Sequence, residues 1–250
     1  MTYNNDKETI MRIKNSLALA VALAATGAMA SDYRAEGGLS YIDLDGDDHI
    51  IAVDGTFYFE QVQTARRPLA EAAFLGRNSN ISLSYGTFDE ADIDLINLGA
   101  EVWVDDFYLS AEFSRADLDA VNLDDYEARL GYMVGDGFLV NVGFANGDSF
   151  DKASVLLGTK YVAPVGGNFI NLEADLEVND GDSQLSLVGD YFFNNQFSAG
   201  LRLTETDVSG VKTEFGVGAK YFITSTISGE LEYTTQDSVD TIGVRFAARF

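Results

Sequence analysis

The sequence contains no cysteine, only two prolines and a single histidine among its 250 residues. Without cysteine the chain has no disulfide scaffold, no thiol nucleophile and no cysteine-ligated zinc. Basic residues are also few, because 16 Lys and Arg stand against 40 Asp and Glu, for a formal net charge of -24. A chain with this excess of negative charge repels polyanions, and the sequence has no basic stripe that would offset it. Nucleic acid is therefore excluded as a partner.

Long apolar runs are equally scarce, and the prominent one lies near the N-terminus. Arg12 and Lys14 precede the run LALAVALAATGAMA, which ends in Ala-Met-Ala. This order is typical of a secretory signal peptide cut before Ser31, and the run is too short for a convincing membrane helix; a buried N-terminal helix is the alternative. We therefore expect residues 1–30 to be removed, with residues 1–10 as an extra leader.

The rest of the chain, residues 31–250, alternates with a period of two. About fourteen segments of roughly ten residues alternate apolar and polar side chains, and Gly, Asn and Asp separate them. Pro68 and Pro164 fall in connections, where a missing backbone donor does no harm. The pattern predicts one all-β domain, a transmembrane antiparallel up-and-down β-barrel of about 14 strands, with 12 and 16 as the alternative counts.

Aromatic residues recur with the period of one hairpin. Four tyrosines lie 29 or 30 residues apart, each near the end of a predicted strand and before a short turn. They would stand at one height, as an aromatic girdle does at the interfacial layer of a bilayer; cross-strand pairs in a soluble sandwich are the alternative. The girdle residues are Tyr132, Tyr161, Tyr191 and Tyr221.

The two ends of the predicted barrel differ in charge. Connections such as FDEADID and RADLDAVNLDD are acidic, whereas the turns that follow the tyrosines carry few charges. With an even number of strands both termini lie at the aromatic end, which is the periplasmic end of an outer-membrane barrel. The acidic connections are then predicted to be extracellular.

Within each predicted strand one face is apolar and the other carries the charges. Isolated charges are too costly to bury, so the charged face must line a wet or ion-paired lumen while the apolar face meets lipid. Pairing that closes the lumen is the alternative to an open pore. The candidate pore-lining residues are Arg34, Glu36, Asp54, Glu101, Glu112, Glu127, Arg129, Lys160, Glu173, Asp175, Glu177, Arg202, Glu214, Lys220, Glu230, Glu232, Arg245 and Arg249.

One periplasmic connection, QVQTARRPLAEAAFLGRNS, is long and has helical features. Its proline suits the first helical position and its glycine suits the helix end. The simpler interpretation is a short helix at the rim of the barrel. The alternative is a segment that folds inward and narrows or plugs the pore. The constricting residues would then be Pro68, Leu69, Glu71, Phe74 and Leu75.

The stretch PLAEAAFL after the second predicted strand, the leader, the succession of strands and the final Phe250 together resemble the general porin family of Gram-negative bacterial outer membranes. The resemblance extends over most of residues 31–250. It implies a location in the cell outer membrane. It also implies that the last strand, TIGVRFAARF, is recognised by the barrel-assembly machinery, with Phe246 and Phe250 as signal residues.

The sequence offers little for catalysis or for metal binding. His49 is predicted to lie in the first outside loop, whereas a Ser-His-Asp hydrolase of the membrane type needs a histidine beside a serine on the barrel wall. The stretch DLDGDDH is similar to the acidic start of a calcium-binding loop. However, Asp48 occupies the position where an EF-hand requires glycine. We expect no enzymatic activity, no metal site and no cofactor.

Two functions from different classes remain. The first is a porin for passive diffusion of ions and small hydrophilic solutes, cation-preferring because lumen anions outnumber lumen cations. The alternative is a closed structural or surface-interaction barrel whose acidic extracellular loops are bridged to lipopolysaccharide by divalent cations. The expected partners are outer-membrane lipid, lipopolysaccharide and the barrel-assembly machinery. The sequence leaves homo-oligomers open, since a subunit contact and a lipid contact are both apolar.

Overall fold

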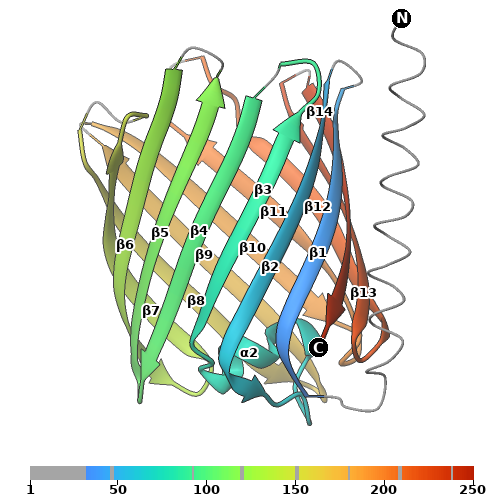
Figure 1. The fold of residues 1–250 in the computed structure, drawn as a ribbon. Helices are drawn as coiled ribbons and strands as arrows, with labels where there is room; N and C mark the ends of the chain where they lie inside the picture. Colours follow the sequence, from blue (N-terminus) through green and yellow to red (C-terminus); the bar gives the residue numbers. More distant parts are fainter. Residues whose placement is uncertain are drawn as a thin grey trace, which may run out of the picture.

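The computed structural model describes residues 32–45, 48–91, 93–118, 121–149, 152–179, 181–207, 210–237 and 239–250. The predicted signal peptide, residues 1–30, lies outside the described residues. Over the described part of the chain, the strands form one closed all-β barrel (Figure 1). The predicted fold class is therefore confirmed, together with the preferred count of about 14 strands.

Each strand pairs antiparallel with its neighbours in the chain, and the first strand pairs with the last to close the barrel. Closure removes the two free edges that an open sheet would expose. The strands are β1 (Tyr33–Leu44), β2 (Asp48–Val62), β3 (Asn80–Phe88), β4 (Ile93–Val104), β5 (Phe107–Leu118), β6 (Val121–Gly135), β7 (Phe138–Gly147), β8 (Ser154–Val165), β9 (Asn168–Asn179), β10 (Asp182–Phe192), β11 (Phe197–Thr206), β12 (Glu214–Thr224), β13 (Ile227–Gln236) and β14 (Val239–Arg249).

The two ends of the barrel differ in their connections. At one end, which we call the turn end, lie Tyr33, Phe250 and short turns such as residues 136–137 and 166–167. Gly137 has a φ of 74°, and a Cβ atom there would overlap the carbonyl oxygen of Val162, so this turn requires glycine. At the opposite end, which we call the loop end, the longest connection spans residues 207–213.

The outer face of the barrel is apolar. In β12, the side chains of Phe215, Val217 and Tyr221 are 40% to 50% exposed, whereas Lys220, between them, pairs with Glu230 inside the barrel. Exposed large apolar side chains occur on every strand of the barrel. Because monomeric soluble proteins rarely expose apolar patches of this extent, the outer face must be covered by lipid.

The connection between β2 and β3 folds inward. Residues 63–79, which we call the inner segment, contain the 3₁₀ helix η1 (Leu69–Glu71) and the helix α2 (Ala72–Gly76), and they lie within the turn end of the barrel (Figure 1). Ala72 is fully buried and packs with Tyr33 and Val62 of the wall. The position at the rim, the simpler of the two expectations, is therefore wrong, because the apolar side of the segment is buried against inward-facing apolar residues.

The proline expected at the start of the helical segment and the glycine expected at its end agree with the structure only in part. Pro68, with a φ of -58°, directly precedes η1, and Gly76 is the last residue of α2. The left-handed conformation that ends the helix falls on Arg77, with a φ of 52°, rather than on the glycine. Arg77 also pairs with Asp106 of the next turn at 2.7 Å, which ties the helix end to the wall. No helix among the described residues is both long and apolar enough to cross a membrane.

The wall of the lumen is not polar along its whole length. Close to the inner segment, inward-facing Met133, Leu139 and Phe222 are buried, and a cluster that includes the first two packs against Phe74 and Trp103. Buried Arg249 and Glu71 also lie near the turn end, so the interior there combines charged and apolar side chains. The apolar wall provides the surface on which the inner segment packs.

The lipid-facing and lumen-facing sides of the strands should differ in how well they tolerate an added charge. Leu201 is 56% exposed on the outer face of β11, whereas Thr204 of the same strand faces the lumen, opposite Glu214. We expect Leu201→Arg to lower the free energy of unfolding in lipid vesicles by about 2–4 kcal/mol, because the cation would enter hydrocarbon. The control Thr204→Arg should cost less than about 1 kcal/mol, because its cation stays in water. Equal losses in denaturant titrations would contradict the assignment.

Candidate functional site: the lumen and the inner segment

Arg245 of β14 is the centre of the largest ion-pair network in the lumen. Its guanidinium contacts Asp54 of β2 at 2.6 Å, Glu230 of β13 at 2.8 Å and Glu36 of β1 at 3.1 Å. Glu230 in turn pairs with Lys220 of β12 at 2.8 Å. The network therefore crosses five neighbouring strands, including the seam between β1 and β14.

A glycine makes room for this network. Gly38 lies opposite Asp54 in the β1–β2 register, and a Cβ atom there would stand 2.6 Å from the Nε atom of Arg245. Any side chain at this position would displace the guanidinium from its carboxylates. The geometry of the network thus depends on a neutral residue as well as on its charges.

Arg249 connects the seam to the inner segment. Its Nε atom donates to Glu36 at 2.6 Å, and its Nη1 atom donates to the backbone carbonyl of Leu69 at 2.9 Å. The guanidinium also lies over the rings of Tyr33 and Phe222, at 4.3 and 4.4 Å from their centroids. Arg249 is buried, so this cation holds the segment in place and is shielded from solute.

Lys160 of β8 holds the inner segment from the opposite side. Its ammonium lies 2.9 Å from Glu71 of η1 and 2.9 Å from Glu173 of β9. It also lies 5.0 Å from the ring centroid of Phe74. Two lumen cations, on β8 and β14, are therefore committed to the segment.

Further along the wall, β9 to β11 form a second polar network. The Nδ2 atom of Asn171 donates to Glu173 at 2.7 Å and to Asp190 at 3.2 Å. Asp190 pairs with Arg202 of β11 at 3.0 Å. Because this network and the contacts of Lys160 share Glu173, the charges of four strands and of the inner segment are connected.

Arg129 of β6 forms a further ion-pair cluster in the lumen. It pairs with Glu127 at 2.5 Å and with Asp175 at 2.6 Å, and it donates to Asn141 at 3.1 Å. Asp175 lies on β9, so this contact reaches past β7 and β8 along the concave wall. Pairing across strands, the alternative expected for the lumen charges, therefore accounts for many of them.

Several predicted pore-lining residues stand outside these networks. Glu101 accepts hydrogen bonds from Asn80 at 2.9 Å and from Tyr108 at 3.0 Å. Arg34 lies at the β-bulge near the turn end, where it is exposed and makes no ion pair among the described residues. Four further carboxylates have no ion pair in the described part of the chain: Glu112, Glu177, Glu214 and Glu232.

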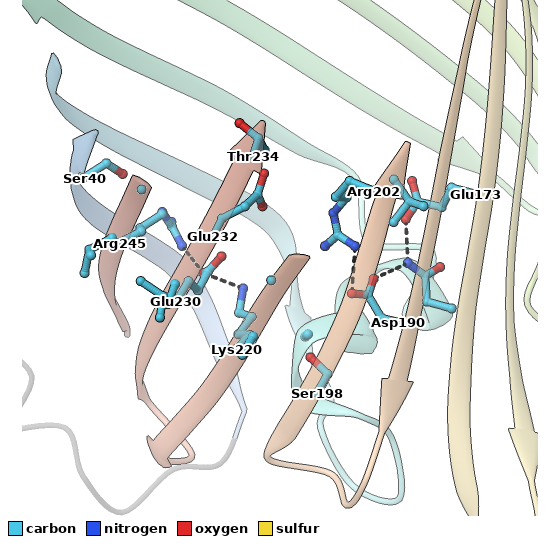
Figure 2. Close-up of a pocket in the computed structure, with 18 of the residues that line it drawn as sticks. Ser40, Glu173, Asp190, Ser198, Arg202, Lys220, Glu230, Glu232, Thr234 and Arg245 are labelled. Atoms are coloured by element: carbon cyan, nitrogen blue, oxygen red, sulfur yellow. Dashed lines mark hydrogen bonds and ion pairs between the residues drawn. The ribbon is translucent and has the colours of Figure 1, made fainter. Parts of the chain in front are cut away.

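Three cavities lie along the lumen in the described part of the chain. The largest, about 580 Å³, is lined by β9 to β14 and β1, and Ala70 and Glu71 of the inner segment contribute to its lining. Figure 2 shows this cavity with Lys220 and Glu230 at one side and Arg202 with Asp190 at the other. Two smaller cavities, about 260 and 170 Å³, lie along β2 to β6, and both are lined by Glu112.

The structure places the predicted constricting residues inside the barrel. Pro68, Leu69 and Glu71 are buried, and Leu69 N–H donates to the carbonyl of Asn195 in the β10–β11 turn at 2.8 Å. Phe74 lies 6.2 Å, centroid to centroid, from Trp103 of β4. The segment therefore contacts both sides of the wall and crosses the turn end.

Sequence reasoning missed the neutral and apolar members of the site. Asn171, Asn80 and Tyr108 bind lumen carboxylates but carry no charge, and the selection of pore-lining residues rested on charge. Asp190 shares its face with Val188 and Phe192, so the alternation there is mixed. Its position opposite Gly200, two residues from Arg202 along β11, becomes visible only with the strand register.

The four girdle tyrosines lie on the outer face at the turn end, between 38% and 50% exposed. Three of them make cross-strand ring contacts: Tyr132 with Phe107 at 5.2 Å, Tyr161 with Phe138 at 5.5 Å, and Tyr221 with Phe197 at 6.3 Å. Tyr191 contacts Phe193 at 5.0 Å.

At the loop end, carboxylates brace the connections. Asp48 accepts the N–H of Glu90 at 3.0 Å. Asp207 accepts the N–H of Ser183, which lowers the pKa of Asp207 and keeps it ionised. Residues 46 and 47 of the DLDGDDH stretch lie outside the described residues. Over the remainder, no group of three His, Asp or Glu is arranged to hold a metal ion.

Comparison with solved structures agrees with the barrel. The outer membrane protein Omp33 of Acinetobacter baumannii is similar with a TM-score of 0.79 and 26% identity, over 88% of this chain and 99% of that chain. The KdgM porin shares the fold with a TM-score of 0.50 and 11% identity, over 86% and 99% of the two chains. A variant of the Rh. blastica porin does so with a TM-score of 0.51 and 10% identity, over 86% and 98%.

Residues 7–154 match the sequence profile of the family described as "Putative general bacterial porin", and the chain belongs to this family. No curated protein sequence matches it. Family membership and the similarity to an outer membrane protein make it a porin-type β-barrel of the bacterial outer membrane. By the topology of this class, the turn end is periplasmic and the loop end is extracellular.

The network around Arg245 makes a second stability prediction. Arg245→Met would leave Glu36, Asp54 and Glu230 close together without their shared cation, so we expect the free energy of unfolding to fall by about 3 kcal/mol. The control Arg115→Met breaks an exposed pair with Asp124 and should cost less than about 1 kcal/mol. Denaturant unfolding in vesicles measures both, and a similar cost for the two variants would show that the network adds no stability.

Proposed function

We propose that this protein forms a water-filled outer-membrane channel for passive diffusion of ions and small hydrophilic solutes, with a preference for cations. The observation that carries the proposal is the imbalance of free charge in the lumen. Every predicted lumen cation except Arg34 is held in ion pairs, whereas Glu112, Glu177, Glu214 and Glu232 make none among the described residues. Solutes would therefore meet a net negative wall, which raises the local concentration of cations.

The inner segment supports a narrow channel. It crosses the periplasmic end, and its contacts with Lys160, Arg249 and Asn195 tie it to β8, to β14 and to the β10–β11 turn. A barrel of this strand count would otherwise leave a wide opening. The segment thus favours small solutes over large ones.

One observation favours the second candidate function, a closed structural barrel. Val62, Ala72 and Phe222 are almost completely buried at the turn end, as in a packed core. If this packing persists in the membrane, the barrel carries no current, and its acidic loops would act through divalent cations and lipopolysaccharide. Measurements of conductance separate the two functions.

Export and assembly complete the proposal. Residues 1–30 would act as a signal peptide cleaved before Ser31. Phe246 lies on the outer face of β14, where it is 50% exposed, and Phe250 is 49% exposed. Exposed aromatic side chains at the end of the last strand support a role in recognition by the barrel-assembly machinery.

Removal of the segment tests the constriction. We expect deletion of Ala65 to Arg77 to raise single-channel conductance in planar bilayers about twofold or more, because it opens the periplasmic end. The double variant Glu71→Gln with Lys160→Met keeps the segment but removes their ion pair, so its increase should be smaller. Unchanged conductance of a folded, heat-modifiable deletion variant would refute the constriction.

The selectivity is tested at an unpaired lumen carboxylate. Glu112→Gln should lower the cation-to-anion permeability ratio, seen as a smaller reversal potential in a potassium chloride gradient, because the wall loses a free negative charge. Glu205 is exposed on the outer face of β11, so the control Glu205→Gln makes the same charge change outside the lumen. Anion preference of the unmodified channel would contradict the proposed selectivity.

A further inference from the structure

Gly218 of β12, which has no side chain, forms part of the wall of the largest cavity, and we call it the glycine floor. Gly216, two residues away on the same face of β12, is not part of the cavity lining. Arg202 of β11 lies opposite Gly216, and Glu232 of β13 lies opposite Gly218. Arg202 and Glu232 therefore line the same cavity, from the strands on either side of β12 (Figure 2).

The register sets the separation of these two residues. Arg202 and Glu232 are two strands apart and are offset by two residues along the strands. With strands about 4.8 Å apart and a rise of about 3.3 Å per residue, their Cα atoms lie on the order of 12 Å apart. Both side chains line the cavity, so a small solute that lies between them contacts both.

Both charged groups are open to a solute. Glu232 is exposed and makes no ion pair in the described part of the chain. Arg202 uses only Nη1, which donates to Asp190 and to the carbonyl of Leu201, so Nε and Nη2 remain as donors. The other cations of the cavity lining, Lys220 and Arg245, are both held by Glu230.

We propose that this cavity is a binding subsite for a small zwitterion, a solute that carries one ammonium and one carboxylate group. Arg202 receives the carboxylate through Nε and Nη2, in the bidentate geometry that a guanidinium offers. Glu232 receives the ammonium. The inference rests on the proposed function only in that the solute reaches the cavity through the lumen.

The pairing of opposite charges decides the class of solute. A simple cation leaves the free donors of Arg202 without a partner, and a simple anion meets repulsion from Glu232. A zwitterion satisfies both groups at once and lies with its dipole along the line that joins them. The glycine floor and the volume of about 580 Å³ leave room for the carbon skeleton of such a solute.

The first experiment measures binding without any channel assay. The full mature chain, refolded in detergent micelles, is titrated by calorimetry with glycine, with glycinamide and with acetate. Glycinamide keeps the ammonium but lacks the carboxylate, and acetate keeps only the carboxylate. We expect glycine to bind with a dissociation constant in the millimolar range and each half to bind at least about tenfold more weakly. Equal binding of glycine and glycinamide, or no binding of glycine, would overturn the proposal.

Variants locate the subsite. Glu232→Gln and Arg202→Met should each weaken glycine binding at least about fivefold, whereas the outer-face control Glu205→Gln should leave it unchanged. Gly218→Leu fills the floor without a change of charge, and its Cβ atom would make ordinary contacts, the nearest at 3.6 Å with Oε2 of Glu232 and the carbonyl oxygen of Leu231. This variant should abolish binding. Retention of binding in folded Gly218→Leu would place the site elsewhere and refute the assignment.

The two proposals fail in different ways. Binding of glycine by a barrel that carries no current would refute the channel and leave the subsite standing. Cation-selective current with no binding of glycine would refute the subsite and leave the channel standing. In conducting protein, glycine should also reduce the potassium current in a concentration-dependent manner, and Glu232→Gln should remove this block.

Discussion

The structure depends on one constraint: in hydrocarbon, every backbone N–H and C=O group needs a partner within the protein. A sheet meets this need only when its first and last strands pair, as β1 and β14 do from Glu36 opposite Arg249 to Leu44 opposite Thr241. The seam also carries side-chain contacts, because Arg245 and Arg249 of β14 both bind Glu36 of β1. Closure therefore gives the charged faces an enclosed lumen and leaves the apolar faces to the lipid.

Once the barrel is closed, its interior must be filled or wet. In this protein the interior is packed near the periplasmic end and contains cavities farther from it. Near the periplasmic end, the inner segment packs on Tyr33, Val62 and Trp103, and Lys160 and Arg249 hold it by charge. Farther from that end, the wall carries ion pairs, unpaired carboxylates and cavities. Permeation and the proposed subsite both depend on this division between a packed base and a hydrated body.

The alternation of side chains allowed the barrel and its approximate strand count to be predicted, because lipid on one side and water on the other impose a period of two on every strand. The candidate site was predicted less completely. Charged residues such as Glu230 and Arg245 could be found from their face alone. The alternation also places Asn171 on the inner face, but its hydrogen bonds to carboxylates and the burial of Phe222 could not be predicted. The helical features of PLAEAAFL indicated a helix, yet nothing local distinguishes a helix at the rim from one inside the barrel.

The sequence by itself determined the fold class, the two faces of each strand and the excess of negative charge, since these follow from the order of residues within single strands and turns. Only the tertiary structure decided which charges cancel and which remain free. Arg202 and Glu232 belong to different strands, and the glycine floor between them exists only because β11, β12 and β13 pair in one register. The inward fold of the inner segment was likewise decided by the wall, because its apolar side chains pack on residues that the closure of the barrel brings around them.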